Sequence, residues 1–239
     1  MNVALVFAGG TGQRMHSNAR PKQFLELYSK PIIAYTLEVF QSHPEIDAII
    51  VPCVKGWLGQ LREIAEKYKI NKLIKIIPGG ATTQQSKLLA LRALRDICKD
   101  DDAILIHDAV RPLITHKLID DNLACLRQFG NAITVEPFTE TGVVSEDGRS
   151  VDAAIERGRL YIAKAPQTFF YGEALSAHEA AQDMPDAITI DTCTIMTELG
   201  KKLYFVPCLS SNIKITTPED YYMFKAIYDL HESNIVLGM

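Results

Sequence analysis

Four short apolar runs, each followed by a helical pattern, constrain the fold of this chain more than any other feature. The runs span residues 3–7, 48–54, 73–77 and 103–107, and the helical patterns span 31–43, 57–69, 82–97 and 115–128. The runs do not alternate with polar residues, which is typical of strands buried on both faces. Successive strand–helix units connect through right-handed crossovers. We therefore predict an α/β, Rossmann-like fold: a mostly parallel sheet with helices on both faces.

A different pattern begins near residue 136. Between about 137 and 164, β-branched and polar residues alternate around Asp147-Gly148, which predicts a β-hairpin arm with its turn at that step. Helical patterns return at 172–184 and 192–200, short strands are expected at 204–208 and 212–216, and Pro218 begins a last helix to about Leu230. No repeat or linker is visible, so we expect one domain over residues 1–239 with the arm inserted in it.

The predicted arm carries apolar residues that a two-stranded hairpin cannot bury alone. They are Val143, Val144, Val151 and Ile155. A second copy of the arm would cover them, so we expect a homodimer through residues 137–164. The alternative is an arm folded back onto its own domain.

Composition excludes several classes of protein. With 25 Lys+Arg against 29 Asp+Glu, the net charge is −4, which argues against a nucleic-acid partner. No segment is apolar for 18 residues, and the run at 3–8 is too short for a signal peptide, so we expect neither a membrane span nor export. Five scattered cysteines without a CxxC pair favour free thiols in the cytoplasm. Five scattered histidines (His16, His43, His116, His178 and His231) are expected at the surface or as caps.

A glycine-rich loop follows the first predicted strand. It reads Ala8-Gly9-Gly10-Thr11-Gly12, with Arg14 and Lys22 further along the same loop. Glycines after a first parallel strand expose backbone N–H groups that bind phosphate. Met15 stands where a dinucleotide-binding motif has its third glycine, which speaks against an NAD-dependent reductase, and the P-loop pattern is also absent.

Together with later motifs, this loop resembles a known family. AGGTGQRM-(5)-PKQFLEL, the Gly79-Gly80 pair with Ser86, HDAVRP (107–112), APQTFF (165–170) and NIKITTPED (212–220) occur in the order and spacing of one group. That group is the CTP-dependent cytidylyltransferases acting on ribitol 5-phosphate or 2-C-methyl-D-erythritol 4-phosphate. The resemblance implies CTP and a polyol phosphate as substrates, and Mg²⁺ as cofactor.

The resemblance also implies roles for individual residues. Arg14, Lys22 and Lys214 are the expected catalytic cations. Arg157, Asp108 and Lys214 are expected to bind the polyol phosphate, with Arg157 coming from the partner subunit and Arg159 competing for its role. The expected nucleotide-binding residues are Ala8, Gly9, Gly10, Thr11, Gly12, Gly80, Ala81 and Ser86.

Two of these assignments also have a basis in the residues themselves. Asp108 follows a predicted parallel strand, at the edge where open α/β sheets bind ligands, and is the expected Mg²⁺ ligand. The helix after Pro112 is better capped by Thr115 than by Asp108. Lys214 lies in a predicted buried strand, where a lysine needs an anion. Arg111 belongs to the same HDAVRP motif as Asp108, and its alternative is a structural role, pairing with an acid near the sheet edge.

The chain departs from the methylerythritol-phosphate enzymes at three places, one of which is Ile190-Asp191, where they tend to read Thr-Asp. Thr83-Gln84-Gln85 stands where they often carry an arginine, so one phosphate contact is missing or is replaced by Lys87. Ala165 stands where they tend to have threonine. HDAVRPLITHKLIDDN and SSNIKITTPED are closer to the ribitol-phosphate enzymes. We therefore favour D-ribitol 5-phosphate as acceptor, with methylerythritol phosphate as the alternative. A non-catalytic CTP-binding protein is an alternative of another class.

Overall fold

The computed structural model describes residues 1–10, 20–184 and 191–237. Its elements in chain order are β1 (Asn2–Phe7), η2 (Lys22–Phe24), β2 (Glu26–Leu27), β3 (Lys30–Pro31), α1 (Ile32–Ser42), β4 (Ala48–Cys53), α2 (Leu58–Lys67), β5 (Leu73–Pro78), α3 (Thr83–Ala93), β6 (Ala103–Asp108), α4 (His116–Phe129), β7 (Asn131–Pro137), β8 (Val143–Val144), β9 (Ala153–Ala154), β10 (Tyr161–Phe170), α5 (Tyr171–Ala180), η3 (Ala181–Asp183), α6 (Thr192–Glu198), β11 (Phe205–Pro207) and α7 (Pro218–Leu237).

A seven-stranded sheet forms the centre of the molecule, in the order β11-β7-β10-β6-β1-β4-β5. Strands β6, β1, β4 and β5 pair in parallel, which confirms the parallel arrangement that the four apolar runs predicted. Strand β10 lies antiparallel between β6 and β7, and β11 pairs in parallel with β7. The return strand of the arm thus completes the sheet, and the fold is α/β as expected.

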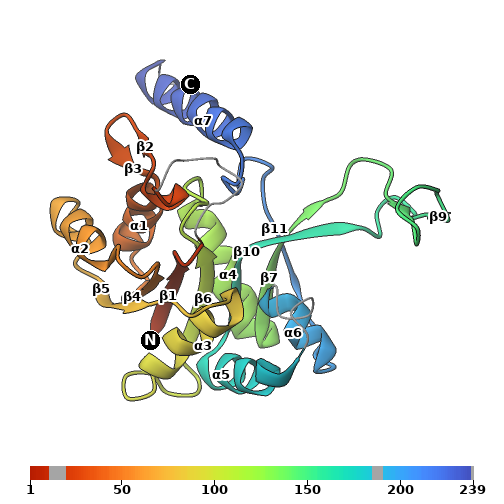
Figure 1. The fold of residues 1–239 in the computed structure, drawn as a ribbon, viewed down its shortest axis with the longest axis horizontal. Helices are drawn as coiled ribbons and strands as arrows, with labels where there is room; N and C mark the ends of the chain where they lie inside the picture. Colours follow the sequence, from red (N-terminus) through yellow and green to blue (C-terminus); the bar gives the residue numbers. More distant parts are fainter. Residues whose placement is uncertain (11–19, 185–190, 238–239) are drawn as a thin grey trace.

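Helices cover both faces of this sheet (Figure 1). One buried cluster joins Ala4 and Val6 of β1 to apolar residues of α1, α2 and α4. The other joins Val3 and Leu5 of the same strand to α3, α5 and α6. Because side chains alternate across a strand, an apolar run such as VALVF is buried on both faces at once. This arrangement in three layers explains why the strands are continuous apolar runs in the sequence.

The segment between β7 and β10 is the predicted hairpin arm. Strands β7 and β10 still pair at Pro137 and Tyr161, and β8 pairs with β9 further out. The turn is closed by Asp147, whose Oδ1 accepts hydrogen bonds from the backbone N–H groups of Arg149 (2.7 Å) and Ser150 (2.8 Å). Gly148 has a φ of 68°, which glycine adopts without strain. Figure 1 shows the arm reaching away from the rest of the molecule.

The predicted strand at 212–216 is wrong, because that segment pairs with no strand of the sheet. Its backbone is held by other partners. Ile215 N–H donates to Val110 O at 2.9 Å, and the carbonyl of Asn212 accepts from Arg111 Nη1 at 2.9 Å. The side chain of Asn212 donates to Ala165 O at 2.8 Å. This segment therefore joins the end of β6 to β10 without forming a strand.

Other element boundaries also differ from the sequence-based expectation. Helix α3 ends at Ala93 instead of residue 97, and α7 continues to Leu237. The short pair β2–β3 was not predicted. In the described part of the chain, no helix has both the length and the apolar character that crossing a membrane requires.

Two histidines expected at the surface or as caps have buried side chains, although His43 does end α1 as its C-cap residue. His43 and His178 are both fully inaccessible to solvent. The Nε2 atom of His43 lies 3.1 Å from Asp120 Oδ1, and Nε2 of His178 lies 3.2 Å from Thr192 Oγ1. Burial lowers the pKa of His178 to about 3, so the ring is neutral and belongs to the core.

Candidate active site

Two pairs of glycines meet at the carboxyl edge of the parallel strands. Gly9 and Gly10 follow β1, and Gly79 and Gly80 follow β5, with Gly79 N–H donating to Cys53 O at 2.7 Å. A Cβ atom on Gly9 would come within 2.7 Å of the Phe7 ring, and one on Gly80 within 2.5 Å of Gln85 Cβ. Contacts that short do not occur, so side chains are excluded here. The two turns therefore present bare backbone at the edge where open α/β sheets bind ligands.

Gln23 fastens the start of the glycine loop to the short helix η2. Its Nε2 donates to Ala8 O at 2.7 Å and to Gly10 O at 3.2 Å, and the side chain is almost fully buried. Lys22 precedes it in η2 and is thereby kept close to the glycines. Thr11, Gly12 and Arg14 lie outside the described residues. The phosphate-binding roles of the loop, Lys22 and Arg14 stay predictions.

Ser86 shapes the second glycine turn. Its Oγ accepts from Gly80 N–H at 2.9 Å and donates to Thr82 O at 2.9 Å, while Ala81 N–H donates to Gln85 Oε1 at 3.0 Å. Ser86 is 1% exposed. The hydroxyl proton is therefore already used inside the protein, and the described contacts give Ser86 a positioning role. Direct contact of Ser86 with cytosine stays a prediction.

Asp108 lies at the end of β6 and is held by two cations. Its Oδ1 is 2.7 Å from Lys214 Nζ, and its Oδ2 accepts from Arg111 Nε at 2.9 Å. Lys214 and Arg111 hold the pKa of this carboxyl well below its usual range, although burial acts in the opposite direction. Lys214 meets an anion, as expected, but its side chain is 41% exposed and not mostly buried as predicted. Thr115 caps α4, its Oγ1 accepting from Leu118 N–H at 3.2 Å, as predicted.

A cavity of about 320 Å³ opens beside Asp108. It is lined by Phe7, Thr83, Lys87, Ile106, His107, Asp108, Arg111, Ala163, Lys164, Ala165, Gln167, Asp191 and Lys214. Asp108 and Lys214, predicted from distant motifs, come together here. Thr83 and Ala165, two of the departures from the methylerythritol-phosphate pattern, line the same cavity. Ile190, the third, lies outside the described residues. A role of these positions in choosing the acceptor stays a prediction.

Sequence reasoning missed two charged residues of this cavity, Lys164 and Asp191. Lys164 forms an ion pair with Glu136, and its side chain is 9% exposed. Asp191 caps α6, its Oδ1 accepting from Thr194 N–H at 2.8 Å. Neither residue belongs to a glycine or strand-end motif. The one local signal was the position of Lys164 directly before the buried part of β10, residues 165–169.

Arg157 is not brought to this cavity. It lies on the arm between β9 and β10, where its Nη2 donates to Thr141 Oγ1 at 3.1 Å. It is exposed and does not line the cavity of its own chain. A role in acceptor binding therefore requires the arm of a second copy, as the sequence analysis expected.

Asp108 fits a magnesium ion only in part. Both of its oxygens are engaged by Lys214 and Arg111. Within residues 1–10, 20–184 and 191–237, no group of three metal-binding side chains occurs. Mg²⁺ commonly binds through one or two carboxylates together with substrate phosphates. The donor set therefore fits an ion that arrives with a nucleotide, with Asp108 as its one protein carboxylate.

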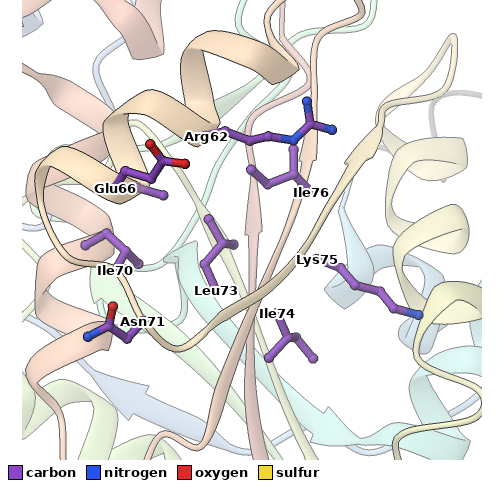
Figure 2. A pocket seen from close by; sticks show the side chains of 9 residues that line it. Arg62, Glu66, Ile70, Asn71, Leu73, Ile74, Lys75 and Ile76 are labelled. Carbon is purple, nitrogen blue, oxygen red and sulfur yellow. The ribbon is translucent and has the colours of Figure 1, made fainter.

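A larger hollow, of about 540 Å³, lies elsewhere, between α2 and the edge strand β5 (Figure 2). Its walls mix charged Arg62, Glu66 and Lys75 with exposed Ile74. It contains none of the residues that the sequence predicted for the site. We therefore place the candidate active site at the glycine turns and the Asp108 cavity.

The chain is similar over nearly its whole length to known proteins. The family model described as "IspD: 2-C-methyl-D-erythritol 4-phosphate cytidylyltransferase" matches residues 2–229. The chain is 43% identical over 238 residues, with full coverage of both chains, to a ribitol-5-phosphate cytidylyltransferase of Vibrio parahaemolyticus. It is 37% identical over 229 residues to a 2-C-methyl-D-erythritol 4-phosphate cytidylyltransferase of Clostridium botulinum, covering 95% of this chain and 97% of the relative.

A solved structure is similar over the same length. The 4-diphosphocytidyl-2C-methyl-D-erythritol synthase of Anaerococcus prevotii superposes with a TM-score of 0.81 at 26% identity, covering 95% of this chain and 96% of that one. The similarity thus spans the sheet, the helices and most of the chain, and is not confined to the glycine loop.

Proposed function

The chain belongs to the 2-C-methyl-D-erythritol 4-phosphate cytidylyltransferase (IspD) family and is a cytidylyltransferase; from this premise we propose that it transfers CMP from CTP to D-ribitol 5-phosphate, giving CDP-ribitol and pyrophosphate. The observation that carries the choice of acceptor is full-length identity of 40% and 43% to ribitol-5-phosphate cytidylyltransferases of Streptococcus agalactiae and Vibrio parahaemolyticus. The cavity supports it, because Thr83 and Ala165 both line it.

The chemistry joins two polyanions, so the barrier is mainly charge repulsion and in-line positioning. The phosphate oxygen of the acceptor attacks the α-phosphorus of CTP, and the bond to pyrophosphate breaks. The substrate itself is the nucleophile, so no side chain forms a covalent bond. In the proposed site, the bare turns at Gly9–Gly10 and Gly79–Gly80 hold the nucleotide, while Asp108 positions the ammonium of Lys214 beside the acceptor.

We propose Mg²⁺ as the cofactor, entering as its complex with CTP. When bound, it would neutralise phosphate charge that the side chains alone leave exposed. Asp108 is the residue that would hold it on the protein side.

We further propose that the enzyme is a homodimer through the arm. Val143, Val144 and Val151 are 53%, 44% and 67% exposed on it, an apolar surface that a second arm would cover. In such a dimer the partner's arm would supply Arg157. We infer a cytoplasmic location, because all five cysteines are unpaired thiols.

The test is a pyrophosphate-release assay with CTP and Mg²⁺. D-Ribitol 5-phosphate and 2-C-methyl-D-erythritol 4-phosphate are compared side by side, and we expect kcat/KM to be at least tenfold higher for the former. The reverse preference would establish the methylerythritol alternative. Binding of CTP without turnover of either acceptor would favour the non-catalytic alternative.

A further inference from the structure

Lys87 occupies a position that normally holds an apolar residue. It lies on the same face of α3 as Ala90, Leu91 and Leu94, all of which are in the core, and it is itself 6% exposed. A buried ammonium costs free energy unless it meets an anion or several acceptors. The position therefore calls for a partner.

The protein itself supplies few acceptors for the ammonium of Lys87. Within the described part of the chain, the ammonium of Lys87 has one hydrogen-bond acceptor, Thr192 Oγ1, at 3.4 Å. Asp191 and Asp108 are close enough to favour its charged form, although neither forms an ion pair with it. An ammonium carries three N–H donors. Two of them are left for a molecule in the cavity that Lys87 lines.

The other cations of the cavity each form an ion pair with a carboxylate. Lys214 and Arg111 share Asp108, and Lys164 is paired with Glu136. Asp191 spends one carboxylate oxygen on capping α6. Among the cations of the described lining, Lys87, on the α3 side of the cavity, is thus the one without an ion pair.

We assign the cavity to the acceptor, because its lining does not include the glycine turns expected to hold the nucleotide. None of Gly9, Gly10, Gly79 and Gly80 lines it. Phe7 does, and its ring lies so close to Gly9 that a Cβ atom there would come within 2.7 Å of it, so the cavity is next to the glycine turn. The lining on the far side includes Ala165 and Gln167 of β10.

We infer that Lys87 binds the phosphate of the acceptor, donating its two remaining N–H groups to the phosphate oxygens. This inference rests on the proposed function in requiring a phosphorylated acceptor, and it holds for either polyol phosphate. It makes Lys87 the replacement for a cation that the Thr83-Gln84-Gln85 segment lacks.

Lys87→Met tests the inference by steady-state kinetics, because methionine keeps the shape and removes the donors. We expect the KM for the acceptor to rise about tenfold or more, the loss typical of a hydrogen bond to a charged group, with the KM for CTP within twofold of the original. Lys75→Met is the matched control. Lys75 lies on β5, donates to Ala93 O at 2.5 Å and should affect neither KM.

Stability separates this role from a structural one. Lys87→Met should melt at the same temperature as the original chain or higher, since it removes a buried charge. If that variant fails to fold, Lys87→Gln, which keeps a polar terminus, takes its place in the same comparison. An unchanged acceptor KM, or a rise in the CTP KM alone, would overturn the inference.

The inference and the proposed function fail in different ways. Turnover of methylerythritol 4-phosphate in place of ribitol 5-phosphate would refute the proposed acceptor, and the same KM comparison on that acceptor would still test Lys87. If neither is turned over, calorimetric binding of ribitol 5-phosphate replaces KM. The inference would then be overturned if the original chain and Lys87→Met bound ribitol 5-phosphate with equal affinity, or if neither protein bound it.

Discussion

Asp108 holds two cations with its two oxygens, and this arrangement decides what a substitution there does. Lys214 is 41% exposed and reaches the site from solvent, whereas the Arg111 side chain is 10% exposed and has Asn212 O as its other described acceptor. Removing the carboxylate frees Lys214 at little cost. The same change leaves a nearly buried guanidinium without its counter-charge.

We predict that Asp108→Asn lowers kcat at least 100-fold in the pyrophosphate-release assay. The amide keeps the shape but no longer positions Lys214 by charge. The free energy of unfolding should also fall, by about 1–3 kcal/mol, because Arg111 loses a charged acceptor. Urea unfolding measures the second effect. Asp121→Asn is the matched control, since Asp121 pairs with exposed Lys117 at 2.7 Å on α4. Near-normal turnover of Asp108→Asn would refute the assignment of this site.

Lys87 gives the reaction a pH dependence. Burial lowers its pKa from 10.5 to about 8, against the opposing effect of Asp191 and Asp108 and with a smaller contribution from Lys214. His178 also lies near it, but burial lowers the pKa of that ring to about 3, so it does not titrate in this range. Above pH 8 the free enzyme therefore loses the charge that attracts a phosphate. We predict that kcat/KM for the acceptor falls as the pH rises from 7.5 to 9.5.

The control for this profile is Lys87→Met. Without the titrating amine, its lower kcat/KM should change little over the same pH range. A fall of equal size in the variant would assign the titration to another group, such as the substrate.

At the scale of elements, the arm is the part whose function a single chain does not explain. Val143, Val144 and Val151 are exposed on it, and Arg157 lies on it outside the cavity. Both facts have the same explanation if two arms exchange between subunits. Each active site would then combine Asp108 of one chain with Arg157 of the other.

Subunit complementation tests this arrangement. As a homodimer, Asp108→Asn should be nearly inactive. The Arg157→Ala homodimer should be nearly inactive when the acceptor concentration is low. Mixed by unfolding and refolding together, they form heterodimers in which one site has both native residues. We predict that the mixture regains about a quarter of the original activity, from the half of dimers that are mixed. Activity that stays at the sum of the parents would contradict the shared site. Arg159→Ala in place of Arg157→Ala is the control.

The elements could be predicted where local pattern and burial agree. VALVF became β1, and the segment after Thr115 became α4, because apolar periodicity and capping specify them without help from distant residues. The segment 212–216 failed because its alternation looks like a strand, while Arg111, Ala165 and Val110 take up its backbone or side-chain hydrogen bonds. Those partners lie far away in the sequence.

The candidate site shows the same division. Glycines after strands and Asp108 at a strand end follow from sheet geometry, so the sequence could predict them. Lys164 and Asp191 enter the cavity only through the packing of β10 and α6. Lys87 carried a readable signal, a lysine on the apolar face of an amphipathic helix, four residues before Leu91. That spacing predicts burial, and the chemistry of a buried lysine then predicts a ligand.

At the scale of the whole molecule, net charge describes the surface and not the site. The chain carries −4 overall, yet its first acid is Glu26, after Arg14, Arg20 and Lys22. The Asp108 cavity likewise has four cations, Lys87, Arg111, Lys164 and Lys214, against Asp108 and Asp191 in its lining. An acidic protein can therefore bind two polyanions, because a few desolvated cations in one place outweigh screened charges spread over the surface.

Two buried histidines link the stability of the molecule to pH. Burial lowers the pKa of His107 from 6.5 to about 4 and that of His178 to about 3. In both rings Nδ1 is buried without a described partner, so protonation would leave an uncompensated N–H. Unfolded histidine binds a proton near pH 6.5, whereas the folded rings do not. The unfolded state thus takes up more protons between pH 6.5 and 4, and the folded state loses stability as the pH falls through that range.

We predict a loss of about 2 kcal/mol from each histidine between pH 7.5 and pH 5, so about 4 kcal/mol from the pair. Urea unfolding followed by circular dichroism at the two pH values measures it. His107→Gln keeps a donor for Arg111 O, which His107 Nε2 contacts at 3.2 Å, and removes the titration. That variant should lose about 2 kcal/mol less than the original chain on acidification, even if it is less stable at pH 7.5. An equal loss in both proteins would show that carboxylates, and not the buried histidines, set the acid sensitivity of the fold.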